Sequence, residues 1–545
     1  MAIKDDTAAR TAPAAQRSRV PAAGRWVWLG TFVTVAGLML ARSAFLFSTR
    51  LHETADEAAN SILVTQAQHF TLLHGNYSRT GFFHPGPAYM YVMAAGQWLF
   101  QDATHLVPTP WNGQLIAILL LNSALLATVA WIVYRWARSP WAAVAAAALI
   151  ILLAAAIDVG VPPAANTDVL AANWMPDMYV PVFLGFIVAA ASVAAGRTAH
   201  LWLLAATGWM LIHGHAEFLF FVPLIVAAAA VSALWPARHA PWAAVRRFAR
   251  RRWRHYVPAL LVSALFALPI VADLLLHWPG QFGKYWHYAH SAKVGHNSLG
   301  QVARYLLWYW SPGPWWLGLL VLVVTVAAAV MAAKKVTPAA AELRRFLLAA
   351  LWLCAVTTAG MLYYGVRGID TLNDRYIGFF YWSVPLLTIL VTATGLTAAL
   401  RGRRVTGLVV AGAAAAALAV GAVSPALRAD AHDNEPALVP AMAALAARAH
   451  GRVIVMRTVG ALYDAHGLLV QAERTGVRAC LTGSNQLLFA VTTEFLCGPR
   501  QEAAGFRVWV YPRPYPPVPG QQVIARLRYS VVTVADPAPA ARPGA

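Results

Sequence analysis

The sequence is poor in charged residues. Only 12% of its 545 residues are Asp, Glu, Lys or Arg, whereas a soluble domain carries about 25%. Hydrophobic residues make up 59% of the chain. This composition excludes an ordinary soluble protein, and it predicts that lipid surrounds most of the chain.

Acidic residues are scarcer than basic ones: 22 Asp and Glu stand against 42 Lys and Arg, for a formal net charge of +20. In a soluble protein this excess would suggest nucleic-acid binding. Here the basic residues cluster between long apolar runs, most densely at 246–254. Anionic lipid on the cytoplasmic side explains such clusters better, so we expect no nucleic-acid partner.

Cysteine is rare, with three residues, and no CxxC motif is present. Cys354 lies inside an apolar run and is interpreted as an inert small hydrophobe. Cys480 and Cys497 both lie in the more polar C-terminal region. We predict a disulfide between them, in an oxidising compartment, over a metal or redox role.

Apolar runs long enough to cross about 30 Å of hydrocarbon are abundant. Basic clusters precede the first run, follow the second and sixth, and separate the eighth from the ninth and the tenth from the eleventh. All clusters fall on one side if the N-terminus is cytoplasmic. About eleven runs are present, so the C-terminus is predicted outside; they lie near 26–47, 113–134, 140–157, 178–195, 200–213, 217–235, 257–278, 313–333, 346–365, 377–398 and 405–425.

The segment 87–100 is apolar enough to suggest one more span. Counting it would place Arg135 and Arg138 outside and reverse every later loop. We therefore predict a helix that lies in the outer interface. The fold class that follows is an α-helical polytopic membrane protein with a small extracytoplasmic α/β domain at its C-terminus.

Three parts are expected along the chain. Residues 1–25 are Ala/Arg/Pro-rich and are predicted to form a disordered cytoplasmic tail. Residues 26–425 form the transmembrane domain, whose first helix is a retained anchor and whose outer loop spans 48–112. Residues 426–545 form the α/β domain, with strands expected at 452–458, 487–492, 506–511 and within 523–534, and a helix at 460–475.

Most acids of the membrane part fall in the outer loops and outer helix ends of this topology, which predicts that the chemistry faces outside. The first outer loop contains the adjacent acids Asp56 and Glu57. Two carboxylates at the mouth of a membrane protein suit a general base, a cation ligand or both. The alternative is that they only start a helix and are stabilised by its dipole.

The order of these features resembles the GT-C superfamily of polyprenyl-phosphate-sugar-dependent glycosyltransferases. That superfamily includes protein O-mannosyltransferases, lipid A aminoarabinose transferases and mycobacterial arabinosyltransferases. The resemblance rests on Asp56-Glu57, on His84-Pro85-Gly86-Pro87 before the interfacial helix, and on Asp374-Arg375-Tyr376 followed by Pro385. His-Pro-Gly-Pro departs from the commoner His-Pro-Pro-Leu, which leaves the subfamily open.

The resemblance implies that Asp56 takes the proton from the acceptor hydroxyl, with Glu57 as a supporting carboxylate or cation ligand. The donor would be a polyprenyl-phosphate sugar, transferred with inversion to an envelope glycan, lipid or protein. The enzyme would then be a multi-pass protein of the bacterial inner membrane, with its active site facing the periplasm or exterior and membrane lipids as partners.

The donor phosphate needs fixed cations near the outer membrane surface. Arg367 and Arg375 are the main candidates, since guanidinium pairs with phosphate through two hydrogen bonds. Further candidates for substrate binding are Lys284, Lys293, His296, Arg79, Asp374 and Tyr376. The alternative for each cation is snorkelling or a pair with Asp370 or Asp374.

The turn His213-Gly214-His215-Ala216-Glu217 joins two spans on the same side as His84. Imidazole and carboxylate suit a divalent cation, so Glu57, His215 and Glu217 are candidate ligands for Mg²⁺ or Mn²⁺. We favour a tight polar turn over metal binding, and contact with substrate stays open. No cofactor is predicted with certainty.

Two other classes of function remain as alternatives. A transporter or flippase of lipid-linked glycans would place polar residues on both sides and at the midplane of several spans. A non-catalytic membrane scaffold would tolerate loss of Asp56. The gathering of polar residues outside favours the enzyme.

Overall fold

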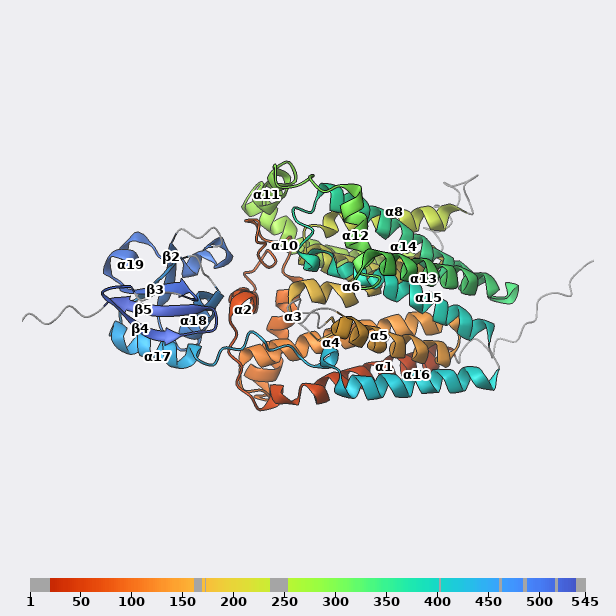
Figure 1. Cartoon of the computed structure of the whole chain (residues 1–545), viewed down its shortest axis with the longest axis horizontal. Helices are drawn as coiled ribbons and strands as arrows, with labels where there is room; N and C mark the ends of the chain where they lie inside the picture. The colour runs from red at the N-terminus through yellow and green to blue at the C-terminus, as the bar shows by residue number, and fades with distance from the viewer. Residues whose placement is uncertain are drawn as a thin grey trace, which may run out of the picture.

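The computed structural model describes residues 20–160, 169–171, 173–235, 253–400, 403–459, 463–483, 488–514 and 518–535. Most of the predicted N-terminal tail, residues 1–19, lies outside these ranges, and so do residues 236–252, which include most of the basic cluster at 246–254. Figure 1 shows a long helical body and a small sheet domain at one of its ends.

Nine helices of the described residues are long and apolar enough to cross a membrane. They are α1 (Val20–Arg42), α4 (Pro110–Ala137), α5 (Pro140–Gly160), α6 (Met175–Ala194), α10 (Trp253–Leu276), α13 (Trp315–Lys335), α14 (Ala341–Arg367), η8 with α15 (Arg375–Trp382 and Ser383–Ala399) and α16 (Arg404–Val423). The first predicted run, 26–47, is not helical throughout, because α1 ends at Arg42 and a 3₁₀ turn follows at Ala44–Phe47.

Two further apolar helices are shorter. α7 (Leu201–Gly214) and α8 (Phe218–Leu234) have 14 and 17 residues, which is about 21 and 26 Å at 1.5 Å per residue. They correspond to two of the predicted runs. The number of spans is odd whether this pair is counted or not, nine without it and eleven with it. An odd number of spans places the two termini on opposite sides, so that prediction does not depend on α7 and α8.

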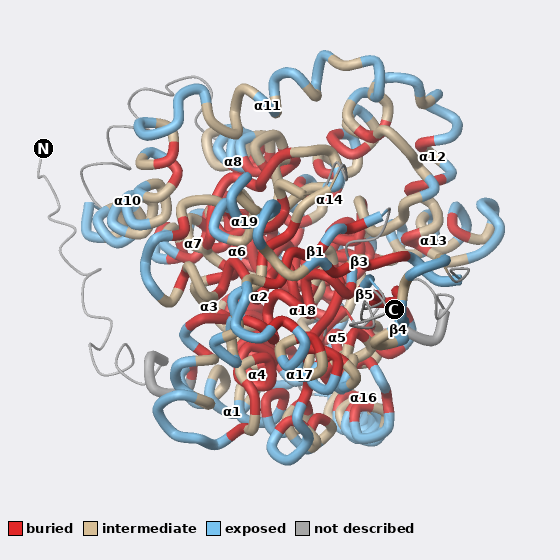
Figure 2. The backbone as a smooth tube through the Cα atoms, turned by 90° about the vertical axis from the view of Figure 1, so that its left-hand side faces the viewer, coloured by how far each residue is buried: buried red, intermediate tan, exposed pale blue. Residues whose placement is uncertain are grey.

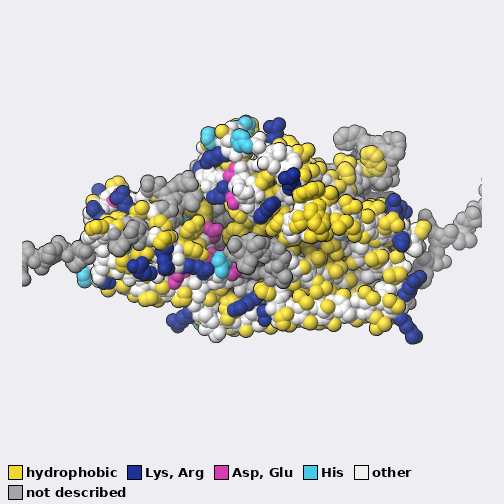
Figure 3. All heavy atoms as spheres, in the orientation of Figure 1, with side chains coloured by type: hydrophobic (Ala, Val, Ile, Leu, Met, Phe, Trp, Pro, Cys, Tyr) yellow, Lys and Arg dark blue, Asp and Glu magenta, His cyan; other side chains and the backbone are white. Residues whose placement is uncertain are grey.

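The outward faces of the peripheral helices are apolar. Leu260 and Leu265 of α10 and Leu408 of α16 expose more than 60% of their surface. Figure 2 shows buried backbone at the centre and exposed backbone at α1, α10 and α16. Figure 3 shows hydrophobic side chains over the body, with Lys and Arg at the end away from the sheet domain. These faces are suited to lipid.

Short helices form the end of the body next to the sheet domain. α2 (Ala55–Gln68) and α3 (Ala88–Gln97, continued by a π-helical turn at Trp98–Ala103) belong to the first outer loop. α11 (Gly280–Ala289) and α12 (Leu299–Trp308) follow α10. With 10 residues, α3 is too short to cross the bilayer, which agrees with the interfacial helix predicted at 87–100.

The C-terminal domain is a five-stranded mixed sheet with the order β2-β1-β3-β5-β4. β1 pairs with β2 and β3 in parallel, and β5 pairs with β3 and β4 in antiparallel fashion. Its elements are α17 (Leu438–Ala449), β1 (Ile454–Thr458), α18 (Tyr463–Arg474), β2 (Ala479–Gly483), α19 (Pro499–Ala504), β3 (Phe506–Pro512), β4 (Gln521–Arg526) and β5 (Ser530–Ala535).

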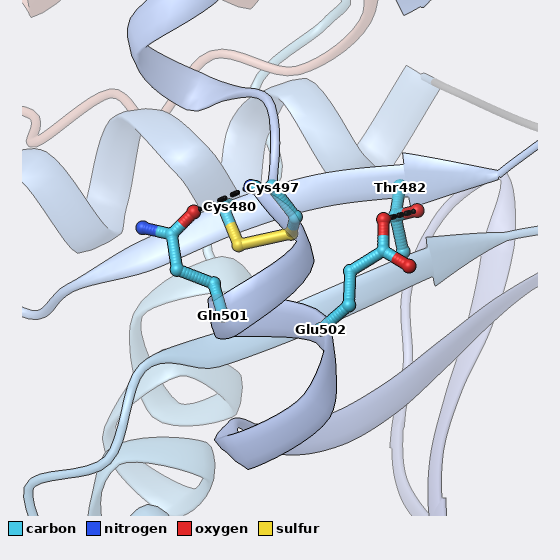
Figure 4. Close-up of a disulfide and its surroundings, with 6 residues drawn as sticks. Cys480, Thr482, Cys497, Gln501 and Glu502 are labelled. Carbon is cyan, nitrogen blue, oxygen red and sulfur yellow. Dashed lines mark hydrogen bonds between the residues drawn. A yellow bond between two sulfur atoms is a disulfide. The ribbon is translucent and has the colours of Figure 1, made fainter.

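Most local predictions for this domain are confirmed, but one is wrong. The segment predicted as a strand at 487–492 is described from residue 488 on, and these residues are not a strand: Leu488–Ala490 is a 3₁₀ turn. Another strand, β2, holds Cys480, and the predicted disulfide to Cys497 is present with Cα atoms 5.0 Å apart. Figure 4 shows that it joins β2 to the segment that leads into α19.

Helix α2 is shared by the two hydrophobic cores. Its residues Ala58 and Ile62 belong to the core of the C-terminal domain, with Leu468 of α18. On its other side, Leu63 and Val64 belong to the core of the helical body. Figure 1 shows α2 between the two parts. The sheet domain therefore packs directly onto the segment that carries Asp56 and Glu57.

Candidate active site

Asp56 lies in the first turn of α2. The preceding residues set its position: Thr54 is extended, and Ala55 adopts a left-handed conformation with φ +51°. For a residue with a Cβ this conformation is strained, and such strain is concentrated at functional sites. The turn leaves the Asp56 side chain only partly buried, at the junction between the body and the C-terminal domain.

Both carboxylate oxygens of Asp56 accept hydrogen bonds from side chains that lie far away in the sequence. The Tyr77 hydroxyl donates to Oδ1, and the Trp174 indole N–H donates to Oδ2 at 3.0 Å. Burial, and then the negative charge of Asp56, raise the pKa of Tyr77 well above its ordinary value. Tyr77 therefore stays protonated and acts as a donor. Each Asp56 oxygen keeps a second lone pair for a substrate hydroxyl.

Glu57 differs from its neighbour in its environment. Its side chain is buried, and the Asn173 side-chain amide donates a hydrogen bond to Oε2. Burial, and then Asp433, Asp56 and Asp430, raise the pKa of Glu57 well above its ordinary value. The two adjacent acids thus have different chemistry: one is partly exposed, and the other favours its uncharged form.

Arg79 forms a second cluster beside Asp56. Its Nη2 lies 2.7 Å from Asp370 Oδ1 and 3.3 Å from Asp374 Oδ2, and its side chain is 41% exposed. Tyr376 packs on the ring of Trp174, with centroids 5.2 Å apart. Since Trp174 also binds Asp56, the structure brings Asp56, Arg79, Asp374 and Tyr376 into one region.

The other predicted cations point elsewhere. Arg375 stacks over Tyr305 and Trp308, at 5.0 and 5.2 Å from their ring centroids. Arg367 is exposed at the end of α14, and Lys284 lies 5.8 Å from the ring centroid of Phe489. Lys293 and His296 are exposed in the loop after α11. Arg375 and Lys284 thus rest against aromatic rings.

His84 and Glu217 are buried, and they form a group with the half-buried His215. The rings of His84 and His215 lie 4.2 Å apart, and His215 Nδ1 lies 3.4 Å from Glu217 Oε1. Burial, followed by His215, lowers the pKa of His84 well below its ordinary value, so it is neutral. Glu217 Oε2 has no hydrogen-bond partner. This group retains hydrogen-bonding capacity for a ligand.

Both ring nitrogens of His213 make hydrogen bonds with backbone groups. Nε2 lies 2.8 Å from the Phe266 carbonyl oxygen, and Nδ1 accepts a hydrogen bond from the Ala88 N–H at 3.2 Å. A Cβ at Gly86 would lie 2.4 Å from His213 Nδ1, so only glycine permits this approach. His213 holds the start of α3 against α7 and α10, and glycine suits the third position of His-Pro-Gly-Pro.

A preformed metal site is absent from the described residues: they contain no group of three or more His, Cys, Asp or Glu side chains placed to hold an ion. Glu57 is engaged with Asn173, while His215 and Glu217 belong to the separate group around His84. Binding of Mg²⁺ or Mn²⁺ by these side chains therefore stays an untested alternative to the polar turn.

Sequence reasoning missed the side chains that position the two acids. Asn173 and Trp174 lie at the start of α6, and Tyr77 lies in the first outer loop. The signal for Asn173 and Trp174 was their place at the outer end of an apolar run, where polar and aromatic side chains meet substrate or interface. Nothing in the local sequence indicates which acid each would contact.

No protein-family model and no curated protein matches the sequence. Among solved structures, ArnT from Cupriavidus metallidurans in the apo state is similar with a TM-score of 0.57 and 14% identity, over 94% of this chain and 98% of ArnT. The same protein bound to undecaprenyl phosphate gives a TM-score of 0.56 and 14% identity, over 93% and 98%.

An oligosaccharyltransferase from Archaeoglobus fulgidus, in complex with zinc and sulfate, reaches a TM-score of only 0.38, at 12% identity, over 89% of this chain and 68% of that one. This likeness is too low to support an inference. The similarity to ArnT, in contrast, includes both the membrane helices and the C-terminal domain, because it covers nearly all of both chains. The chain is a multi-pass membrane protein with the fold of ArnT, and the predicted resemblance to GT-C glycosyltransferases is confirmed at the level of the fold.

Proposed function

We propose that this protein is an inverting glycosyltransferase that moves a sugar from a polyprenyl-phosphate donor to a cell-envelope acceptor. The observation that carries the proposal is the partly buried Asp56 carboxylate, held on both oxygens by Tyr77 and Trp174. A base must be oriented and must still have lone pairs to receive a proton. The ArnT fold supports the class of donor, since ArnT has been crystallised with undecaprenyl phosphate.

The proposed reaction is a direct displacement. Asp56 takes the proton as the acceptor O–H bond breaks, and the acceptor oxygen forms a bond to the anomeric carbon of the sugar. The bond from that carbon to the phosphate oxygen breaks, and its electron pair leaves with the polyprenyl phosphate. One displacement inverts the configuration at the anomeric carbon, as in single-step sugar transfer.

The leaving phosphate needs positive charge nearby. Arg79 is our candidate for this role, because its neighbour Tyr376 packs on Trp174, which donates a hydrogen bond to Asp56. Its partners Asp370 and Asp374 would then serve as counter-charges that hold the guanidinium in place. Arg375, Arg367 and Lys284 stay candidates for the donor path.

The orientation belongs to the proposal too. Lys334 and Lys335 end α13 and Arg404 begins α16, at helix ends opposite the C-terminal domain, and the positive-inside rule assigns this side to the cytoplasm. Asp56 and the C-terminal domain would then face the exterior of a bacterial inner membrane. Nucleotide sugars are absent there, and a lipid-linked donor supplies the sugar.

The test is transfer of radiolabelled sugar from a panel of synthetic polyprenyl-phosphate sugars, with wild type and Asp56→Asn in parallel. We expect transfer or donor hydrolysis by wild type and its loss in Asp56→Asn, while the unfolding temperature is unchanged. Equal turnover by both proteins would remove Asp56 as the base. No turnover with any donor would favour the alternatives of a lipid-linked-glycan transporter or a non-catalytic scaffold.

A further inference from the structure

His466 is a buried residue that the proposed reaction has not used. It lies on α18 in the C-terminal domain and is only 2% exposed. Neither ring nitrogen makes a hydrogen bond of normal geometry, although the Ala55 carbonyl lies nearby. Buried polar groups in folded proteins are almost always paired, and an unpaired one destabilises the fold.

Other buried histidines of the described chain do use their nitrogens. His213 is bonded through both of them, and His84 Nδ1 accepts from the Ala216 N–H at 3.3 Å. His466 therefore differs from residues of the same type and the same burial. An unpaired buried group of this kind has hydrogen-bonding capacity left for a ligand, and its position relative to the candidate site decides whether a ligand can use it.

The ring of His466 lies at the site of Asp56. Its centroid is 6.4 Å from that of Tyr77, which binds Asp56, and its electrostatic partner is the Asp56 carboxylate itself. Burial lowers the pKa of His466 to about 4, and the charge of Asp56 only partly opposes this effect. At neutral pH the imidazole is thus uncharged, with one N–H donor and one nitrogen acceptor.

Three parts of the chain therefore meet around Asp56 and Tyr77. Trp174 from the helical body and Tyr77 from the first outer loop bind Asp56, and the ring of His466 from the C-terminal domain lies edge-on to Tyr77. The polar groups of Trp174 and Tyr77 are both hydrogen-bonded to Asp56. His466 alone among the three keeps its polar atoms unpaired.

We propose that His466 binds the acceptor, through a hydroxyl next to the one that Asp56 deprotonates. This inference rests on the proposed function and narrows the acceptor to a molecule with two neighbouring hydroxyls, as a sugar ring has. A hydroxyl both donates and accepts, so it matches a neutral imidazole that offers one of each. His466 loses no proton in the reaction, since the proton of the attacking hydroxyl goes to Asp56.

Two variants test the role. His466→Phe keeps an aromatic ring but removes both nitrogens, and His466→Gln keeps a donor and an acceptor. The matched control is Gln471→Leu, which removes another buried polar side chain from α18 whose Nε2 is also unpaired. The assay uses the donor that wild type accepts, with octyl glycosides and their deoxy analogues as acceptor probes.

We expect His466→Phe to lower kcat/KM for an octyl glycoside about 10- to 100-fold, the loss of one or two substrate hydrogen bonds. Its unfolding temperature should equal or exceed that of wild type, because an unpaired buried polar group has been removed. Hydrolysis of the donor by water should not change. His466→Gln should recover part of the transfer, and Gln471→Leu should transfer like wild type.

Two results would overturn the role of His466 and leave the enzyme intact. One is normal transfer by His466→Phe while Asp56→Asn is inactive. The other is a loss of transfer in His466→Phe that is accompanied by a lower unfolding temperature and is explained by it. His466 would then be a packing residue. If wild type uses no donor, the proposed function fails first, and this inference fails with it.

Discussion

Arg474 of α18 binds both carboxylate oxygens of Glu53, with Nη1–Oε2 and Nη2–Oε1 distances of 2.9 and 2.5 Å. The Ser61 hydroxyl donates to the same carboxylate at 2.5 Å. Glu53 is fully buried, two residues before α2 begins. This ion pair therefore fixes the C-terminal domain to the segment that positions Asp56.

Loss of Arg474 should weaken the attachment of the C-terminal domain. Arg474→Leu leaves a buried carboxylate without its counter-charge, which costs roughly 3 kcal/mol of stability. We expect a lower unfolding temperature and faster proteolysis between α16 and α17. Arg448→Gln is the control, because Arg448 is exposed and bonds only within its own helix. Equal stability of the two variants would mean that the ion pair contributes little.

The side chains that hold Asp56 should affect turnover more than substrate binding. Trp174→Phe and Tyr77→Phe each remove one hydrogen bond to the carboxylate and keep the ring. Each should lower kcat about 10-fold, which corresponds to about 1.4 kcal/mol, with a small change in donor KM. Tyr91→Phe, whose hydroxyl binds the Leu72 carbonyl at 3.2 Å, should behave like wild type. An unchanged kcat in both variants would exclude orientation of Asp56 by these contacts.

Glu57 should tolerate an uncharged replacement. Because burial and the neighbouring acids raise its pKa, the folded protein favours the neutral form, and an amide has nearly the same shape. We expect Glu57→Gln to unfold at the same temperature as wild type, or at a higher one, at neutral pH. A large decrease would show that the fold requires the carboxylate charge. Glu57→Ala, which leaves Asn173 unpaired, serves as the destabilised reference.

The junction should lose stability as pH rises above neutrality. A hydrogen bond to Asp430 raises the pKa of His432, and the charge of Asp433 adds to it, while burial and Arg528 oppose the shift. The raised pKa stabilises the fold fully below the unfolded value of 6.5, and this contribution disappears as pH rises through the folded pKa. Unfolding temperatures between about pH 5.5 and about pH 8.5 should fall for wild type and stay flatter for His432→Gln. Parallel curves would contradict the assignment to His432.

The helical body could be predicted from the sequence because a membrane span needs only length and apolar composition. The short pair α7 and α8 marks the limit of that reasoning, since a run can be apolar enough and still lack the length. The segment 487–492 failed for a different reason. Leu488 and Val491 pack in the core of the C-terminal domain, whereas Phe489 contacts the rings of Tyr77 and Phe83 in the first outer loop. These contacts depend on the tertiary structure, so the local pattern was not informative.

The candidate site could be predicted only in part. Asp56 and Glu57 were found because they are adjacent acids in an outer loop. Arg79 was found as a cation of the same loop, and Asp374 and Tyr376 as part of the motif that carries the GT-C resemblance. The neighbours of Asp56 could not be predicted from the sequence, since Trp174 and His466 lie more than 100 residues from it along the chain. The difference between the two acids depends on burial, which the tertiary structure sets.

The shared helix α2 has a consequence for biosynthesis. Ala58 and Ile62 are translated early, but their partners in α17, α18 and the sheet are translated after every membrane segment. An unfinished chain therefore carries Asp56 on a helix whose apolar side is bare, and it also lacks His466. A nascent chain cannot assemble the site while it is still being inserted, so activity would begin only with the full-length product. A prematurely terminated chain would instead display the apolar side of α2 to chaperones and proteases.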